Sequence, residues 1–509
     1  MKFDRKCGIL TPVSALPGPY GIGCFGEEAY RFVDFLSDTK QSYWQILPLG
    51  QTGFGDSPYQ SVSTYAGNPY FIDLRELAHL GYIGWDDLNG TFFGEDEGLI
   101  DYGALYGARY PILRRAYENS PYALHPHDWW AGGEHDNVRT EFGAFVDENS
   151  SWIWDFALFS SIKKAMDDKP YLLWEDGLRL RRGEDMERAY AQYADDVRFY
   201  CFIQFHFFRQ WKRLKAYANE RGIMIIGDIP IYVAPDSADT WSHPGLFMLE
   251  DDGTPTMVAG VPPDAFSEDG QLWGNPLYRW SEHESTGYEW WISRLAHAFS
   301  MYDVVRIDHF RGFESFYAIP YGQETARDGE WMKGPGYPFF SAVEEALGDR
   351  PIIAEDLGYL TPEVKELLEQ CGYPGMKVLE FAFGSGPEND YLPHRYPENC
   401  VAYTGTHDNE TLLGWYYSLN APERDFVRTY TGVPDDGAPN SHMIRALFMS
   451  KADTVIVPIQ DYLCLDNHAR INTPSTMGGN NWRYRLPSVP CDGGLIDRIS
   501  AFVRMYGRG

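Results

Sequence analysis

The stretch YDVVRIDHFRG, residues 302–312, joins a short apolar segment to a cluster of charged side chains. Its β-branched residues, which are typical of a buried strand, are Val304, Val305 and Ile307. Its polar end consists of Arg306, Asp308, His309 and Arg311. Two interpretations are open: a salt-bridged strand terminus, or a strand that ends in a catalytic carboxylate held between cations.

Seven further segments share this character, being short, apolar and followed by Gly, Pro or polar residues. They are CGILTPVSAL from Cys7, YWQILPLG from Tyr43, GIMIIGDIPIYV from Gly222, PIIAEDLG from Pro351, GMKVLEFAFG from Gly375, CVAYTGTHDN from Cys400 and TVIVPIQDYL from Thr454. Helical patterns lie between several of them: residues 29–36 place apolar side chains on one helix face, and TPEVKELLEQCG from Thr361 has helix start and stop signals. Strands that alternate with helices pair in parallel, and eight of them predict one α/β domain, a (β/α)8 TIM barrel over residues 1–509.

The spacing of the eight segments is uneven, which predicts insertions. The second and third are separated by a long stretch that is mostly helical and aromatic in character, so we expect a helical insertion subdomain over residues 75–200. After the third segment comes GVPPDAFSEDGQLWGNPLYRW, residues 260–280, whose Gly, Pro and aromatic residues are typical of a functional loop. The sequence therefore predicts long, mainly helical insertions after the second and third barrel strands.

The net charge of −30 argues against polyanionic partners. A nucleic acid or an anionic membrane surface requires a basic patch, and the longest basic stretch is the short RLRRG, residues 179–183. We therefore expect no nucleic-acid partner and no membrane partner, and a neutral substrate fits the composition best. The aromatic content of 16% suits both a large core and a carbohydrate site, and does not choose between them.

Cysteine usage and the N-terminus bear on the compartment. Seven scattered cysteines without a C-x-x-C pair predict neither a zinc site nor a disulfide framework. The stretch MKFDRKCGILTPVSALPG, residues 1–18, lacks a hydrophobic signal core, and no apolar run approaches the ~20 residues of a membrane span. A cytoplasmic protein is the expectation.

Polar residues at the carboxyl ends of the predicted strands are the candidates for function, because barrel active sites lie there. These residues are Asp228, Arg306, Asp308, His309, Glu355, Asp356, His407 and Asp408. A single strand-end carboxylate is commonly a helix N-cap. Several carboxylates that converge on one barrel mouth are costly to bury, and they indicate a function.

Two chemistries suit such a cluster: a divalent metal site with oxygen ligands, and glycoside cleavage by a pair of carboxyl groups. Arg306 precedes Asp308 by two residues, so both side chains point to the same face of a strand. An opposite charge this close favours the ionised form of Asp308, as a nucleophile requires. A metal site gains nothing from an arginine, so the pattern favours glycoside chemistry with no metal and no other cofactor.

The motifs RIDHFRG, AEDLG and GTHDNET resemble the catalytic motifs of α-glucan-active barrels, specifically those of glycoside hydrolase family 77, the amylomaltase family. Four further blocks resemble the same family: GFGDSPYQSVSTYAGNPYFIDL from Gly53, GDIPIYVAPDSADTW from Gly227, LWGNPLY from Leu272 and ARINTPSTMGGNNWRYRL from Ala469. The similarity extends from about Gly8 to Leu486. All blocks occur in order, which makes the resemblance specific.

The resemblance implies a 4-α-glucanotransferase that moves α-1,4-glucan segments between maltooligosaccharides or starch- and glycogen-derived glucans, with glucose as an acceptor. It implies a retaining double displacement with Asp308 as nucleophile, Glu355 as general acid/base and Asp408 as stabiliser of the transition state. The substrate-binding residues that it implies are Asp228, Arg306 and His407 around the attacked sugar, and Ser57, Tyr59, Gln271, Trp273 and Asn275 along the donor and acceptor subsites. The doubled asparagine, Asn480 and Asn481, departs from the family pattern, so the family's asparagine is left unassigned.

Three alternatives share features with this interpretation. A plain α-glucan hydrolase would use the same carboxylates and differ only in the group that attacks the glycosyl-enzyme. A sugar-binding protein without catalysis would have little use for all three carboxylates, and a metal-dependent barrel enzyme would lose its activity to a chelator. Loops that exclude water favour transfer over hydrolysis. The sequence leaves the chain lengths of donor and acceptor and the oligomeric state open.

Overall fold

The computed structural model describes residues 4–53, 55–123, 139–263, 267–358, 360–434 and 439–509. Its central sheet has eight parallel strands in the order β10-β11-β12-β1-β2-β3-β6-β9. Their bounds are β1 (Lys6–Leu10), β2 (Tyr43–Gln45), β3 (Met224–Pro230), β6 (Val304–Asp308), β9 (Ile352–Ala354), β10 (Gly375–Val378), β11 (Cys400–Tyr403) and β12 (Thr454–Pro458). The backbone N–H of Ala354 donates to the carbonyl of Pro374 at 3.0 Å, so the two edges of the sheet meet. The barrel is nearly closed, and the predicted (β/α)8 fold is confirmed.

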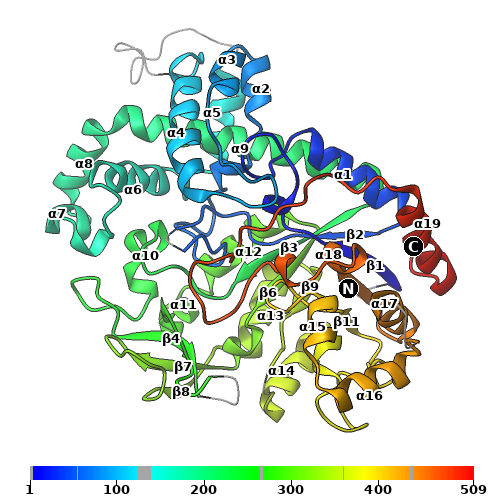
Figure 1. The fold of residues 1–509 in the computed structure, drawn as a ribbon. Coiled ribbons are helices and arrows are strands. Elements are labelled where there is room, and N and C mark those ends of the chain that lie inside the picture. Colours follow the sequence, from blue (N-terminus) through cyan, green and yellow to red (C-terminus); the bar gives the residue numbers. More distant parts are fainter. Residues whose placement is uncertain (1–3, 54, 124–138, 264–266, 359, 435–438) are drawn as a thin grey trace.

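Helices surround this barrel on all sides in Figure 1. Those outside the two long insertions are α1 (Glu27–Asp38), α12 (Glu289–Met301), α13 (Tyr337–Leu347), α14 (Pro362–Cys371), α15 (Leu412–Ser418), α16 (Ala421–Thr431), α17 (Pro439–Met449), α18 (Ile459–Tyr462) and α19 (Gly493–Tyr506). Helix α14 follows its predicted signals, because the Thr361 side chain accepts a bond from the N–H of Val364 and Gly372 ends the helix with a left-handed φ of 69°.

In its described residues the segment between β2 and β3 is mainly helical, whereas the bounds 75–200 of an insertion subdomain remain a prediction. Its helices are α2 (Leu74–His79), α3 (Trp85–Asn89), α4 (Tyr102–Glu118), α5 (Arg139–Glu148), α6 (Ile153–Ala165), α7 (Asp176–Arg179), α8 (Gly183–Gln192) and α9 (Ala194–Glu220). Figure 1 shows α2 to α8 gathered at one side of the barrel, with α9 running between α2 to α5 above it and α6 and α7 below it. Residue 200, the expected end of the insertion, lies inside α9. This helix continues to Glu220, shortly before β3, and so connects the inserted helices to the barrel.

The segment after β3 differs from the expected helical insertion. Besides α10 (Ala238–Ser242) and α11 (Trp280–Ser285), it contains the strands β4 (Met257–Val261) and β5 (Gln271–Pro276). These pair with β7 (Ser315–Pro320) and β8 (Glu330–Lys333), which follow β6, in an antiparallel sheet of order β5-β4-β7-β8. The loop expected over residues 260–280 therefore contains the end of β4 and the whole of β5, and residues 264–266 of it lie outside the described part.

The barrel interior and the helix-facing layer form separate cores, because side chains alternate along each strand. On β6, Val304 points into the barrel, whereas Val305 and Ile307 pack against the helices. The interior core takes residues from all eight strands: Leu10, Tyr43, Ile226, Val304, Ile353, Met376, Val378, Val401, Tyr403 and Ile456. Above this apolar layer, the next inward positions on β3 and β6 are Asp228 and Arg306. The polar residues of the barrel mouth therefore pack directly on this apolar layer.

Two expectations about the chain as a whole can be compared with the structure. All seven cysteines are free. Within the described residues, each helix is too short or too polar to cross a lipid bilayer.

Candidate active site

Arg306 lies at the centre of the barrel mouth, between two carboxylates. The pairing of β3 with β6 sets Asp228 directly opposite Arg306. The Nη1 atom of Arg306 lies 2.7 Å from Oδ2 of Asp228 and 3.0 Å from Oδ1 of Asp308. Arg306 and Asp228 are almost fully buried, so losing one partner would leave an uncompensated charge at a cost of about 3–5 kcal/mol. The prediction that Arg306 and Asp308 share one face of the strand is confirmed.

Tyr59 links this ion pair to an aromatic wall. Its hydroxyl donates to Oδ2 of Asp228 at 2.8 Å. Its ring stacks on the imidazole of His407, with centroids 5.1 Å apart and planes 17° apart, and the indole of Trp482 lies 6.0 Å away. Flat rings of this kind suit the apolar face of a sugar.

Glu355 follows β9 and lies next to Asp308. The register pairs Ile307 with Ala354, so the residues that follow them are neighbours across the two strands. The Oε2 atom of Glu355 accepts a bond from the backbone N–H of His309 at 2.7 Å, and Oε1 accepts one from Leu357 at 2.8 Å. Because adjacent strands lie about 4.8 Å apart, both carboxyl groups can face one sugar ring.

Asp408 lies on the loop after β11 and is held by residues that the sequence interpretation missed. The side-chain amide of Asn472 donates to Oδ1 of Asp408 at 2.6 Å, and Arg470 donates to its backbone carbonyl at 2.7 Å. The Nε2 atom of His407 lies 3.4 Å from Oδ2 of Asp408. Asn472 and Arg470 belong to the block ARINTPSTMGGNNWRYRL, which was recognised as a motif without a role for either residue.

The pKa values of Asp308 and Glu355 are both raised. For Asp308 the main cause is burial, which Asp228 and Asp408 reinforce and Arg306 opposes. For Glu355 the causes are burial and the negative charge of Asp308, against Arg306 and the two backbone hydrogen bonds. Arg306 favours the ionised form of Asp308, as expected from the sequence, but it is shared with Asp228. Arg306 contacts Asp308 and not Glu355, so the proton of the pair is favoured on Glu355.

Among the other predicted substrate-binding residues, Trp273 and Ser57 contact residues that border the carboxylates, His309 and Tyr59. Trp273 on β5 meets the His309 ring edge-on, with centroids 4.8 Å apart, and its indole N–H donates to Gln271 at 3.1 Å. Asn275 is buried and donates to the carbonyl of Val233 at 2.7 Å. Ser57 accepts a bond from the N–H of Tyr59 at 3.3 Å. Sheet β5-β4-β7-β8 thus reaches the barrel mouth through Trp273.

Asn481 and Asp356 have hydrogen-bond partners that indicate structural roles. The Asn481 side chain accepts from the N–H of Thr473 at 3.0 Å and donates to the carbonyl of Thr476 at 3.1 Å, whereas Asn480 is exposed. Asn481 therefore supports the loop that carries Trp482. Asp356 accepts a bond from the N–H of Met376 at 2.6 Å. This bond links the end of β9 to β10, so Asp356 is not part of the barrel mouth.

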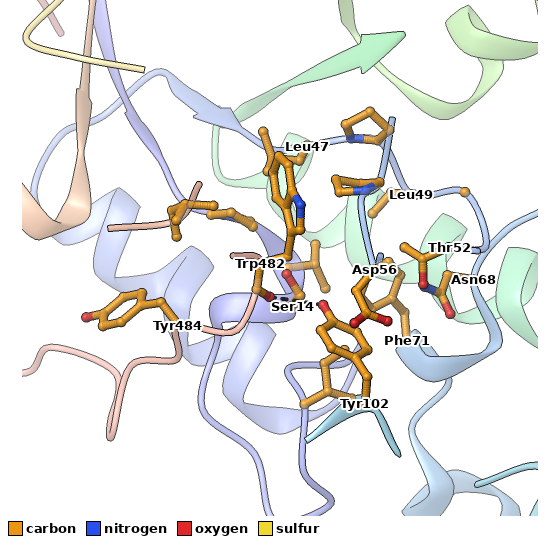
Figure 2. Close-up of a pocket in the computed structure, with 17 residues that line it drawn as sticks. Ser14, Leu47, Leu49, Thr52, Asp56, Asn68, Phe71, Tyr102, Trp482 and Tyr484 are labelled. Carbon is orange, nitrogen blue, oxygen red and sulfur yellow. Dashed lines mark hydrogen bonds between the residues drawn. The ribbon is translucent and has the colours of Figure 1, made fainter. Parts of the chain in front are cut away.

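Figure 2 shows a pocket that shares Trp482 with the aromatic wall of this site. Its lining residues are Pro12, Val13, Ser14, Ile22, Leu47, Pro48, Leu49, Gly50, Thr52, Asp56, Pro58, Asn68, Phe71, Tyr102, Ile471, Trp482 and Tyr484. Trp482 separates the two spaces, since its ring also lies 5.8 Å from that of His407. The Tyr102 hydroxyl donates to the carbonyl of Trp482 at 3.0 Å, which fixes this wall. The three candidate catalytic carboxylates are outside this pocket.

The arrangement can protonate a leaving group from Glu355, attack from Asp308 and stabilise positive charge through Asp408. Within the described ranges, His, Cys, Asp and Glu side chains do not gather in threes or more in a way that could hold a metal ion. The donor set around Arg306 suits a polyhydroxylated, uncharged substrate.

Comparison with known proteins agrees with this chemistry. A family model described as 4-alpha-glucanotransferase matches residues 11–490. The 4-alpha-glucanotransferase of Clostridium butyricum is 45% identical over 97% of this chain and 99% of its own length, and that of Streptococcus pneumoniae is 47% identical over 98% of both. A solved amylomaltase from Streptococcus agalactiae in complex with acarbose superposes with a TM-score of 0.94 at 39% identity, covering 99% of this chain and 100% of its own. The chain therefore belongs to the 4-α-glucanotransferase family, glycoside hydrolase family 77.

Proposed function

We propose that this chain transfers α-1,4-glucan segments between maltooligosaccharides, or between starch- and glycogen-derived glucans, with glucose as the smallest acceptor. The observation that carries the proposal is the pairing of Asp308 with Glu355 across β6 and β9, around Arg306, in a chain of this family. The proposed mechanism is a retaining double displacement, which requires two carboxyl groups about 5 Å apart.

In the first step, Glu355 donates its proton to the glycosidic oxygen while the carboxylate of Asp308 attacks the anomeric carbon. The C1–O bond breaks, a C1–Oδ ester to Asp308 forms, and the shortened glucan leaves with the proton. The raised pKa of Glu355 supports its role as the acid, because the proton is retained at higher pH than on an ordinary glutamate. Arg306 compensates the charge of Asp308 before the attack.

In the second step, Glu355 accepts the proton of an acceptor 4-hydroxyl as that oxygen attacks C1, and the ester bond to Asp308 breaks. Both transition states carry positive charge on the sugar ring, which the carboxylate of Asp408 stabilises. Asn472 supports this role, because its bond to Oδ1 fixes the orientation of the carboxylate. Configuration at C1 is retained after two inversions.

Substrate binding is assigned to the surrounding polar and aromatic groups. Asp228, Arg306 and His407 hold the sugar that is attacked, and Tyr59 positions Asp228 through its hydroxyl. The donor and acceptor subsites use Ser57, Tyr59, Gln271, Trp273 and Asn275. Residues 1–509 act as one catalytic barrel domain, and residues 75–200 form a helical subdomain that, together with β5, helps to exclude water and so favours transfer.

The free cysteines support a cytoplasmic location as part of the same proposal. Incubation of the purified protein with maltotriose, without metal or nucleotide, tests the reaction. We expect glucose and a ladder of longer maltooligosaccharides to appear together. Exclusive formation of shorter sugars, with a matching rise in reducing ends, would instead establish a hydrolase.

A further inference from the structure

Glu380 is a buried carboxyl group that the proposed mechanism does not use. It follows β10 in the short helix η6 (Leu379–Phe381) and is 8% exposed. It occupies the next alternate position after Met376 and Val378, whose side chains fill the barrel interior. A carboxyl group in this place requires an explanation, because burying a charge without a partner is costly.

Glu380 packs against the loop that carries Asp408. A Cβ atom added to Gly405 would lie 2.7 Å from Oε1 of Glu380 and 3.1 Å from Cβ of Asn409. The backbone N–H of Glu380 donates to the carbonyl of Thr404 at 3.3 Å. Glu380 therefore contacts the start of the loop, three residues before Asp408, with no room for a side chain between them.

The same loop is anchored at both ends by a second buried carboxyl group, Asp461. Its Oδ2 atom accepts a bond from the hydroxyl of Thr404 at 2.5 Å, and its Oδ1 atom accepts one from the N–H of Leu412 at 2.8 Å. Asp461 thus holds residues 404 and 412, and Glu380 supports the stretch that begins between them at Gly405. Both carboxyl groups lie beneath the loop that presents His407 and Asp408.

The charges that face Glu380 are mostly negative. Asp461, beyond β12, and Glu410, on the loop after β11, both repel a charge on Glu380, and Arg470 is the cation that opposes them. Arg470 is already engaged, since it donates to the carbonyls of Asp408 and Asn472 at 2.7 Å each. Burial, together with Asp461 and Glu410, raises the pKa of Glu380 well above its ordinary value. Among described residues, Oε1 of Glu380 has no hydrogen-bond partner.

We propose that Glu380 is a positioning residue for Asp408 that works as a neutral carboxylic acid. In this form it fills the space beneath Gly405 and leaves Arg470 to hold the carbonyl of Asp408. Loss of its proton places a third negative charge beside Asp461 and Glu410, attracts Arg470 away from Asp408 and shifts the stabilising carboxylate. The inference deepens the proposed function and rests on the role assigned there to Asp408.

Glu380→Gln tests the neutral form directly, because glutamine has nearly the same shape and cannot ionise. We expect Glu380→Gln to keep the wild-type kcat on maltotriose at neutral pH and to remain active further into the alkaline range. Glu380→Ala should lower kcat about tenfold with little change in KM, since the interaction serves the transition state and not ground-state binding. Glu388→Gln, at an exposed residue of the same segment, is the matched control and should follow the wild type.

Thermal unfolding across the same pH range provides a readout that does not depend on activity. The pKa of Glu380 is raised in the folded protein, so the folded chain keeps a proton that the unfolded chain releases. The free energy of unfolding therefore falls as pH rises from the ordinary pKa of a glutamate toward the pKa of Glu380 in the folded protein. The Tm of Glu380→Gln should therefore exceed that of the wild type by a margin that grows with pH. Coincident pH profiles and a constant difference in Tm would overturn the proposal, as would a Glu380→Gln variant as impaired as Glu380→Ala. A protein that fails to transfer glucan but shows the growing Tm margin would refute the proposed function, and leave Glu380 as a neutral acid.

Discussion

The Oε2 atom of Glu355 lies 2.7 Å from the backbone nitrogen of His309, the residue that follows Asp308. His309 has a left-handed φ of 53°, which is uncommon for a residue with a side chain, and its neighbour Phe310 donates to the carbonyl of Glu355 at 3.0 Å. The proposed nucleophile and the proposed acid/base are therefore positioned relative to each other through the main chain. Their separation does not depend on the side chain at residue 309.

Asp308→Asn should abolish both transfer and hydrolysis while the fold is kept. Arg306 retains Asp228 as its partner in this variant, so no buried cation is left unpaired. We expect a loss of at least about 10⁴-fold in kcat on maltotriose, because the substituted amide cannot act as a nucleophile. Circular dichroism and Tm verify folding, and residual activity within tenfold of the wild type would mean that another group attacks.

Glu355→Gln separates the two steps. It should fail on maltooligosaccharides yet react once with α-glucosyl fluoride, whose leaving group needs little protonation. The glycosyl-enzyme should then accumulate, because the base for the second step is also missing. Intact-protein mass spectrometry followed by peptide mapping should find the sugar on Asp308; an adduct on Asp408 or Asp228 would show that the nucleophile has been misassigned.

Asn472→Ala should reduce kcat by about 10- to 100-fold and leave KM nearly unchanged. The variant removes a hydrogen bond to the carboxylate of Asp408, and bonds to charged groups are worth about 1.5–3 kcal/mol. Steady-state kinetics on maltotriose measure the effect. Asn480→Ala, at an exposed position of the same loop, is the control, and an equal loss of kcat in both variants would contradict the role given to Asn472.

His206→Leu should make the protein less sensitive to acid. Burial, with Arg209 and Arg213 nearby, lowers the pKa of His206 from 6.5 to about 3, so the unfolded chain takes up a proton that the folded chain excludes. Stability is therefore lost as pH falls from the ordinary value toward the folded one, by about 1.4 kcal/mol per pH unit. The Tm of the variant should fall less steeply over this range than that of the wild type. An equally steep fall of Tm in the variant would contradict this role of His206.

Gly227→Ala should destabilise the barrel beside the site. A Cβ atom at Gly227 would lie 2.1 Å from the ring of Tyr302, which is buried and cannot withdraw into solvent. Overpacking of this kind costs roughly 1–3 kcal/mol. Gly245→Ala, where nothing lies within 4 Å of the added atom, should keep the wild-type Tm, and a Gly227→Ala variant of equal Tm would show that the strand adapts.

Much of the fold could be read from the sequence, because each barrel strand carries its own signal. Val304 and Arg306 alternate with Val305 and Ile307, and this period of two separates the barrel interior from the helix layer. Strand ends were recognised by their polar residues, and the structure brings Asp228, Arg306 and Asp308 into contact.

The remaining features depend on contacts that no local pattern encodes. Strand β5 was interpreted as a loop because its segment contains Gly, Pro and aromatic residues. Its pairing with β4, which makes it a strand, is not visible in the local sequence. Asn472 and Arg470 carry no chemical signature of their own, and they matter only because the chain after β12 returns to Asp408. Asp228 was predicted at the same barrel mouth, but only the register of β3 against β6 shows that it shares Arg306 with Asp308.

The strand β1 lies between β2 and β12, and its first residue, Lys6, pairs with Thr454. During synthesis β1 therefore leaves the ribosome long before its partner β12 is made. The barrel cannot close until β12 has been synthesised. Contacts this distant along the chain slow folding and expose unpaired strand edges in the meantime. We expect the need for chaperones to depend on the time that passes before β12 is synthesised. A chain truncated before residue 454 should aggregate, even though it contains every proposed catalytic carboxylate.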